Sequence, residues 1–286
     1  MPLRFVFLAA AAALAVVGPA VAKMMPFRPP ALRAVTADVV VVGTVTAVEK
    51  EVVEVAPEHG APGKVAYKVA VVKVDQPLAG ANTLTHLKVG FTPPPAAAAP
   101  GRPIVRRGGT ELKEGDRYVF FLTRHHAGNF YLMPFTSPPV DAKGENGKAE
   151  LDEVRKGLAA AADPKAALAA AKVEDRAFAA AVLVTKYRTP PETGGETAEV
   201  PLPAGESRLI LKGLAEADWK QGNRFATVSP MTAFLQLGLT PEDGWNPPRA
   251  VPGQPFDFAA ATQTAFTTWL DGPGREYRVK RFVPKK

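Results

Sequence analysis

The sequence predicts an α+β protein, in which an antiparallel, OB-like β-barrel is followed by a mainly helical domain. Three observations lead to this prediction. β-Branched and aromatic residues are concentrated in five runs before residue 140. Turn residues cluster over residues 138–147, and helix formers predominate after them. The chain has 286 residues, which is enough for two units that each bury a core.

The first 22 residues have the three parts of a signal peptide. Arg4 supplies the positive charge, residues 5–17 are apolar, and residues 20–22 form a small-x-small cleavage site. The apolar run is shorter than a comfortable membrane span, so an uncleaved anchor helix is the lesser alternative. We therefore expect an exported protein, periplasmic or extracellular, whose mature chain begins near Lys23 without a transmembrane segment.

A proline-rich leader is expected over residues 23–34, and a barrel domain over residues 35–140. Consecutive valines at 39–42 are typical of a strand that is covered on both faces. The alternation that follows is typical of a strand with one wet face. The five expected strands are residues 37–48, 65–74, 84–91, 117–123 and 130–133, with a proline-rich loop over residues 92–109.

The domain expected over residues 148–286 is mainly helical and ends in a strand at residues 277–283. Asp163 and Ser229 are each followed by proline, and this pairing is typical of a helix N-cap. The three tryptophans are expected to form the core of this domain. Helices are expected over residues 149–161, after Asp163, and over residues 174–187, 206–217, 231–237 and 256–270.

Composition excludes several chemistries. The chain has no cysteine, so disulfides, thiol nucleophiles and cysteine-ligated metals are absent. No serine lies in a Gly-x-Ser-x-Gly elbow, and no glycine pair has the Lys-Ser/Thr of a phosphate loop. The net charge of +7 is spread along the chain, whereas a nucleic-acid binder clusters its basic residues. We expect no cofactor and no specific nucleic-acid partner.

Residues of roughly 35 to 135 resemble the netrin-like, or tissue-inhibitor-of-metalloproteinase-like, branch of OB-fold barrels. The resemblance rests on the segments Ala-Asp-Val-Val-Val-Val-Gly-Thr-Val from residue 37, Tyr-Lys-Val from residue 67 with Pro-Leu-Ala-Gly from residue 77, and Leu-Lys-Glu-Gly-Asp-Arg-Tyr-Val-Phe-Phe from residue 112. It implies a fold. The inhibitory mechanism of that family needs an N-terminal cysteine, which this chain lacks, and a fold does not determine a function. The helical half resembles no family that we can name.

Two further groups of residues have the chemistry of a site. Adjacent histidines, His125 and His126, point to opposite faces of a strand and would share a metal only within a turn. A polar hairpin rim is the simpler interpretation, and no metal site is expected. Acidic pairs such as Asp152-Glu153 and Glu242-Asp243 fall at expected helix starts or turns, where they complement the helix dipole. A hydrolase pair among them would give no local signal.

Two groups of residues are candidates for binding. Phe121 and Tyr131 belong to an aromatic set that would serve as a stacking platform on an OB-like barrel, although half of that set must fill the core. Arg278 and Arg281 belong to a basic C-terminal run that would contact an acidic polymer or a membrane surface.

The sequence therefore predicts an exported, non-enzymatic binding or structural protein of the cell envelope, with an unknown protein or polymer of the envelope as its partner. The alternative is a hydrolase of an envelope polymer that uses carboxylates in an interdomain cleft. A buried carboxylate pair in a cleft, with one raised pKa, would favour the enzyme.

Overall fold

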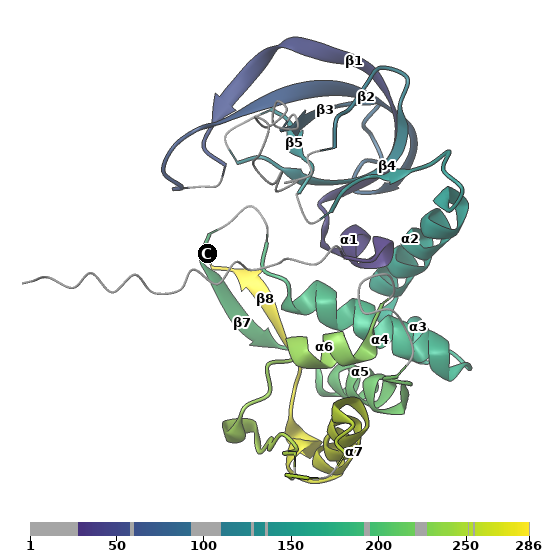
Figure 1. Ribbon diagram of the computed structural model, residues 1–286, viewed down its shortest axis with the longest axis vertical. Helices are drawn as coiled ribbons and strands as arrows, with labels where there is room; N and C mark the ends of the chain where they lie inside the picture. The colour runs from purple at the N-terminus through teal and green to yellow at the C-terminus, as the bar shows by residue number, and fades with distance from the viewer. Residues whose placement is uncertain are drawn as a thin grey trace, which may run out of the picture.

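The computed structural model of the chain describes residues 28–57, 60–92, 110–126, 129–134, 137–191, 195–220, 228–250, 252–253 and 255–285. Within these residues a curved sheet lies over a group of helices, with a small two-stranded sheet beside the helices (Figure 1). This confirms the predicted α+β class. The predicted signal peptide, residues 1–22, lies outside the described residues, as does the leader up to residue 27.

The larger sheet contains β1 (Val39–Val55), β2 (Val65–Ala79), β3 (His86–Phe91), β4 (Arg117–Arg124), β5 (Tyr131–Leu132) and β6 (Val140–Asp141). Neighbouring strands follow the order β1-β2-β3-β5-β4-β6, and β4 also pairs with β1. β1, β2, β3 and β5 therefore each have two neighbours, β4 has three, and the ladder returns to the strand on which it began.

The expectation that every strand pairing is antiparallel is wrong at one place. β3 and β5 are parallel, with Val89 opposite Tyr131 and Gly90 opposite Leu132. β1, β3 and β5 all point the same way, because each of the other pairings in the ring is antiparallel. β5 lies between β3 and β4, which point in opposite directions. Because β5 is antiparallel to β4, it runs parallel to β3.

β1 and β2 are longer than the sequence predicts and continue past the rest of the sheet as a hairpin arm. Residues 49–55 lie beyond the predicted end of the strand at residue 48, yet Val52 to Val55 pair with Val65 to Lys68 of β2. Register shifts interrupt this pairing, the widest between Val48 and Val52. Such bulges increase the local bend and twist, which allows a strand as long as β1 to curve around the sheet.

Both faces are buried at the start of β1, over residues 39–43, and in the middle of β4, as the run of valines predicts for β1. Val41 and Phe120 point into the interior of the sheet with side chains of β2 and β3. Val42 and Phe121 point outward and pack on the helices. Successive side chains of a strand alternate between faces, so adjacent buried residues require two separate cores. One core fills the sheet, and the other joins it to the helical half.

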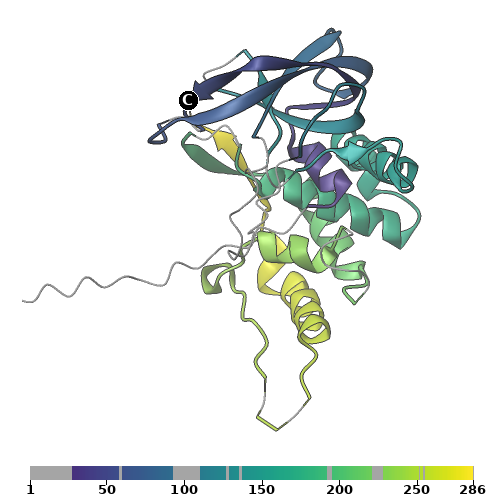
Figure 2. The same ribbon diagram turned by 45° about the horizontal axis from the view of Figure 1, so that its top comes forward.

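Helix α1 (Pro30–Thr36) connects the large sheet to the helical half, and it begins inside the predicted proline-rich leader. Pro30 stands at the first helical position, where proline is tolerated because its missing N–H would have no partner there. Ala31 and Leu32 belong to the helical core, and Ala34 belongs to the core under the sheet. The turned view shows α1 lying between the strands and the long helices (Figure 2). The two halves are thus joined through α1, which contributes side chains to the core of the helices and to the core under the sheet.

The helical half contains α2 (Gly147–Ala162), α3 (Pro164–Leu168), α4 (Val173–Arg188), α5 (Ala204–Glu216), α6 (Pro230–Gln236) and α7 (Phe258–Asp271), with short 3-10 turns η1 (Pro241–Asp243) and η2 (Pro273–Glu276). The predicted caps are confirmed, because Asp163 accepts a hydrogen bond from the backbone N–H of Ala166, and Ser229 accepts one from that of Thr232.

α4 is the central helix of this half. Its residues from Ala179 to Thr185 are all buried, so it has no wet face in that stretch. The three tryptophans are also buried, as predicted, and cluster with Phe234 and Phe266 between α5, α6 and α7. The terminal strand is confirmed as β8 (Lys280–Pro284), which pairs with β7 (Thr197–Pro201).

Candidate functional site

The aromatic residues proposed as a platform on the sheet do not form one surface. Phe121 is completely buried, with the guanidinium carbon of Arg33 5.7 Å from its ring centroid. The expectation of an exposed ring at Phe121 is therefore wrong, because helices cover the outer face of β4. Tyr131 is half-buried against the interior of the sheet, and the Arg124 guanidinium lies 5.9 Å from its ring centroid.

Arg278 and Arg281 are exposed, as a binding role requires. Their neighbours in the basic run are partly neutralised, since Lys280 lies 3.7 Å from Glu199 and Lys285 lies 2.9 Å from Glu196. Arg281 belongs to the small sheet and Tyr131 to the large one. The structure thus leaves the predicted binding residues in separate places.

The histidine pair is part of an aromatic cluster. The ring of His125 stacks on Phe130 at a centroid distance of 4.9 Å, and its Nε2 lies 3.1 Å from the carbonyl oxygen of Ala56. Burial lowers the pKa of His125, and the charge of His126 acts in the same direction. Across the part of the chain that the structure describes, no three His, Cys, Asp or Glu side chains gather closely enough to hold a metal ion.

A groove of about 640 Å³ lies beside α3, between the end of α2, α3 itself and the start of α5. We call it the α3 groove. Its volume falls within the range of about 300–1,000 Å³ that is typical of small-molecule sites. Its wall is predominantly apolar and its rim is charged. It is lined by Ala162, Asp163, Pro164, Lys165, Leu168, Gly205, Glu206, Arg208 and Leu209.

The local sequence explains why a groove forms here. Pro164 cannot continue α2, since it lacks an N–H and clashes with the preceding turn, so the chain must start a new helix. Asp163 closes α2 and caps α3, which consequently leaves at an angle. Leu168 is buried at the floor, whereas Leu209 on α5 stays 36% exposed at the edge. A large apolar side chain is thus presented to solvent beside a buried apolar floor.

One wall of the α3 groove is braced by two polar contacts, one part-buried and one exposed. The Tyr187 hydroxyl donates a hydrogen bond to Oε1 of Glu206 at 2.6 Å. Burial and this carboxylate raise the pKa of Tyr187 well above its usual value, while Arg281 opposes the shift. Lys186 donates to the carbonyl oxygen of Ala161 at 3.1 Å, and desolvation lowers its pKa. Glu206 is therefore engaged from within the protein.

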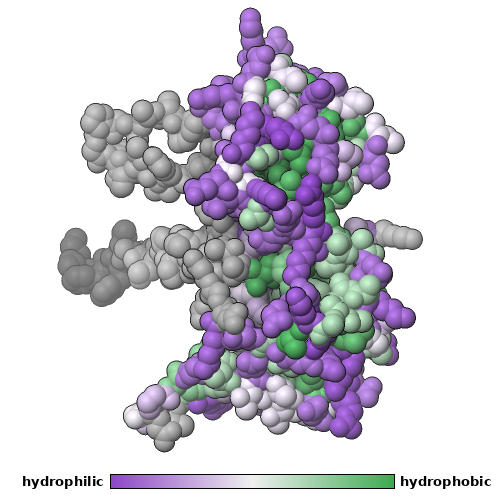
Figure 3. Space-filling model, turned by 90° about the vertical axis from the view of Figure 1, so that its right-hand side faces the viewer, coloured by the Kyte–Doolittle hydropathy of each residue, from purple (hydrophilic) through white to green (hydrophobic). Residues whose placement is uncertain are grey.

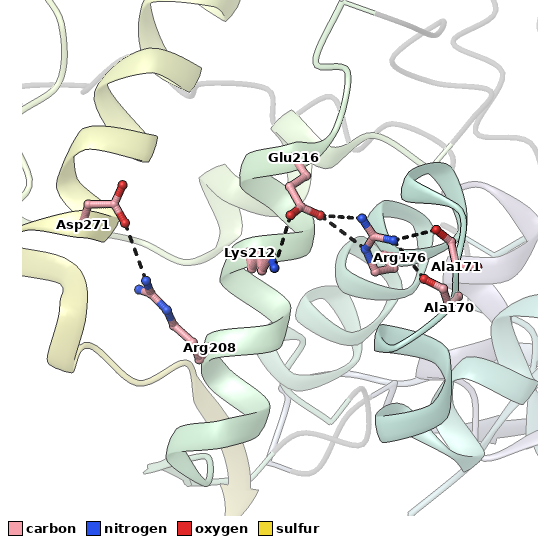
Figure 4. A network of polar contacts seen from close by, with 7 residues as sticks. All are labelled: Ala170, Ala171, Arg176, Arg208, Lys212, Glu216 and Asp271. Atoms are coloured by element: carbon pink, nitrogen blue, oxygen red, sulfur yellow. Dashed lines mark hydrogen bonds and ion pairs between the residues drawn. The ribbon is translucent and has the colours of Figure 1, made fainter.

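The cations at the rim differ in their partners. Arg208 donates to the carbonyl oxygen of Leu270 at 2.9 Å and lies 3.6 Å from Asp271, so its head points toward α7 (Figure 4). Lys165 is exposed and makes no ion pair or side-chain hydrogen bond with any residue of the described ranges. Of the two cations, Lys165 keeps its charge free for a ligand.

The helices around the α3 groove are cross-linked by polar contacts. Arg176 of α4 donates to Oε2 of Glu216 on α5 at 2.8 Å and to the carbonyl oxygens of Ala170 and Ala171, which end the α3 segment (Figure 4). Lys212 adds a second ion pair to Glu216 at 3.6 Å. A guanidinium that satisfies three acceptors holds the three segments in one arrangement. The groove is consequently built on rigid elements.

Glu153 is the carboxyl group whose pKa is raised at the junction of the two halves. Burial is the main cause and the charge of Glu150 adds to it, whereas the N–H of Ala31 and the charge of Arg33 act against it. Its Oε1 is buried and makes no hydrogen bond within the described part of the chain. The opposing effect of Ala31 places Glu153 beside the first turn of α1, where the positive end of the helix dipole favours a carboxylate.

Other surfaces near α3 are also apolar. A second groove of about 470 Å³ lies on its far side, lined by alanines of α2, α3 and α4 together with Phe178. Lys156 spans this groove, with its Nζ 4.5 Å from the Phe178 ring centroid and 2.6 Å from Asp175. Viewed from the side that carries α2 and α3, the surface shows apolar patches between hydrophilic ones (Figure 3). An ion pair joins two lining residues of this second groove, whereas no ion pair joins two of the described residues that line the α3 groove.

Sequence reasoning missed Lys165, Leu168 and Leu209. No local pattern marks these residues in the sequence. Lys165 follows the proline after a helix N-cap, and Leu168 and Leu209 are leucines within expected amphipathic helices. The one available signal was the Asp163-Pro164 break, which predicts where α2 must stop but not what packs beside it.

In comparisons with known proteins, no family model and no curated protein matches this chain. None of the helices in the described ranges combines the length and the apolar character needed to cross a membrane.

Proposed function

We propose that this chain is an exported, non-catalytic binding protein of the cell envelope, and that the α3 groove is its ligand-binding surface. The N-terminal half would be an OB-like barrel of the netrin-like type. The strand order β1-β2-β3-β5-β4, with β4 returning to β1, supports this assignment. The barrel would act as a scaffold or as a second contact surface, since one of its outer faces is already packed on α1 and α2.

The observation that carries the proposal is the combination of an apolar wall, a volume of about 640 Å³ and a charged rim in the α3 groove. Binding sites for small or amphipathic ligands have this composition, because apolar walls supply affinity and a few polar groups supply orientation. Leu209 is the part of this wall most open to a ligand.

The polar groups of the α3 groove support binding better than hydrolysis. Glu206 accepts a hydrogen bond from the Tyr187 hydroxyl, and Asp163 accepts one from the backbone N–H of Ala166. Both carboxylates are thus occupied in holding the fold. A general acid or base needs a carboxyl that is directed at the substrate and has a suitably shifted pKa. The hydrolase alternative therefore receives no support from this site.

Fluorescence of Nile red, a neutral apolar dye, tests the proposal. The parent protein should bind the dye, and Leu209→Asp should abolish binding because it places a charge on the apolar wall. Leu235→Asp is the matched control, since Leu235 is 56% exposed on α6, outside the groove lining. Equal dye binding by both variants would place the apolar site elsewhere and overturn the proposal. Far-UV circular dichroism confirms that both variants remain folded.

Export is part of the same proposal and rests on the N-terminal sequence. Amino-terminal sequencing of the protein recovered from outside the cytoplasm should give Lys23 as the first residue. Recovery only from the cytoplasm, with Met1 retained, would contradict export without affecting the groove.

A further inference from the structure

We propose that the α3 groove takes a single-chain amphiphile with an anionic head group. The head would lie at Lys165, and the chain would follow Leu168 and Leu209. This inference rests on the proposed function and deepens it, because it names the chemistry of the ligand.

The sign of the head group follows from the partners of the rim residues. Two carboxylates and two cations line the groove, so the rim is formally neutral. Asp163 is engaged by the N–H of Ala166 at 3.0 Å, and Glu206 by the Tyr187 hydroxyl at 2.6 Å. Arg208 is held by α7, through Leu270 and Asp271.

Lys165 is left as the rim cation that makes no ion pair or side-chain hydrogen bond with a described residue. A ligand that places an anion beside Lys165 gains a favourable contact, whereas a cationic head would meet an unpaired ammonium group. Charge complementarity of this kind mainly determines which head group is accepted. An anionic head is therefore preferred over a neutral or a cationic one.

The shape and polarity of the groove favour one chain. Leu168, Pro164 and Leu209 form an apolar path, with Lys165 at its rim. The volume of about 640 Å³ suits a small ligand better than a folded partner, whose interface would extend well beyond these residues. A carboxylate or a phosphate head would satisfy the same lysine, so the experiment includes both.

The test is displacement of Nile red by four twelve-carbon amphiphiles below their micellar concentrations: dodecanoate, dodecyl phosphate, dodecanol and dodecyltrimethylammonium. Dodecanoate or dodecyl phosphate should displace half of the dye at a lower concentration than dodecanol. The ammonium compound should need the highest concentration. The identity of the better anion distinguishes a free carboxylate from a phosphate head. Lys165→Gln should weaken the anions about fivefold and leave dodecanol unchanged, because one surface charge contact is lost.

The matched control is Lys148→Gln, at the opposite end of α2, which should change nothing. Equal displacement by dodecanoate, dodecyl phosphate and dodecanol, with Leu209→Asp still abolishing dye binding, would overturn the anionic-head inference and leave the proposed function standing. A fivefold loss of anion affinity in Lys148→Gln would also overturn the anionic-head inference, because the loss in Lys165→Gln would then reflect the net charge of the protein. Unchanged dye binding in the Leu209→Asp variant would instead refute the proposed function itself.

Discussion

Replacing Phe121 by alanine tests whether the sheet and the helices fold as one unit. The side chain is completely buried on the face of β4 that packs on α1 and α2. Truncating a buried phenylalanine costs about 3–5 kcal/mol, because apolar contacts are lost and a cavity remains. At about 2–4 °C per kcal/mol for a chain of this size, Phe121→Ala should lower Tm by about 10 °C.

Tryptophan fluorescence gives this prediction its sharpest readout, because all three tryptophans lie in the helical half. If the shared core couples the halves, Phe121→Ala in the sheet must lower the midpoint seen by tryptophan as much as the midpoint seen by circular dichroism. Phe258→Ala is the control, since that ring is 44% exposed and its loss should cost little. A tryptophan transition that stays at the parental midpoint would show independent unfolding and refute the shared core.

Two further predictions concern the junction between α1 and α2. Burial raises the pKa of Glu153 above its ordinary value of 4.5, so its contribution to stability is present below pH 4.5 and lost as pH rises through the raised pKa. Glu153→Gln should therefore flatten the pH dependence of urea unfolding from pH 4.5 upward, and an unchanged slope would contradict this. Gly157→Val should cost about 1–3 kcal/mol, since a Cβ there would lie 2.8 Å from the Cβ of Ala31. The control Gly205→Ala meets no atom within 4 Å, and equal thermal stability of the two variants would disprove the close approach.

The strands could be predicted because their signal is local. Consecutive valines at 39–42 and the aromatic run ending at Thr123 require burial on both faces, and the structure supplies a core on each side. The hairpin of β4 and β5 could also be predicted, and the two strands are antiparallel. The pairing of β5 with β3 could not be predicted, because β5 has only two residues and its partner is distant in the sequence.

Helix α1 shows where composition misleads. Its seven residues follow two prolines and read as part of a leader, because a helix this short has little stability of its own. It forms because Ala31 and Leu32 fill the helical core while Ala34 fills the core under the sheet. Only the tertiary contacts reveal it.

The α3 groove was beyond sequence reasoning for a similar reason. Its apolar wall combines Leu168 and Leu209, which lie on different helices, and its free charge is evident only once the partners of Arg208 and Glu206 are known. Phe121 and Tyr131 were plausible binding residues in the sequence, but the packing of α1 on β4 decides which rings stay accessible.

The most direct test of the central claim is a methyl NMR titration of the leucine-labelled protein with dodecanoate. We expect chemical-shift changes concentrated at Leu168 and Leu209, with the methyl groups of Leu235 and Leu32 unaffected. Shifts centred on the large sheet, or no saturable shift at Leu168 and Leu209, would contradict a binding site in the α3 groove.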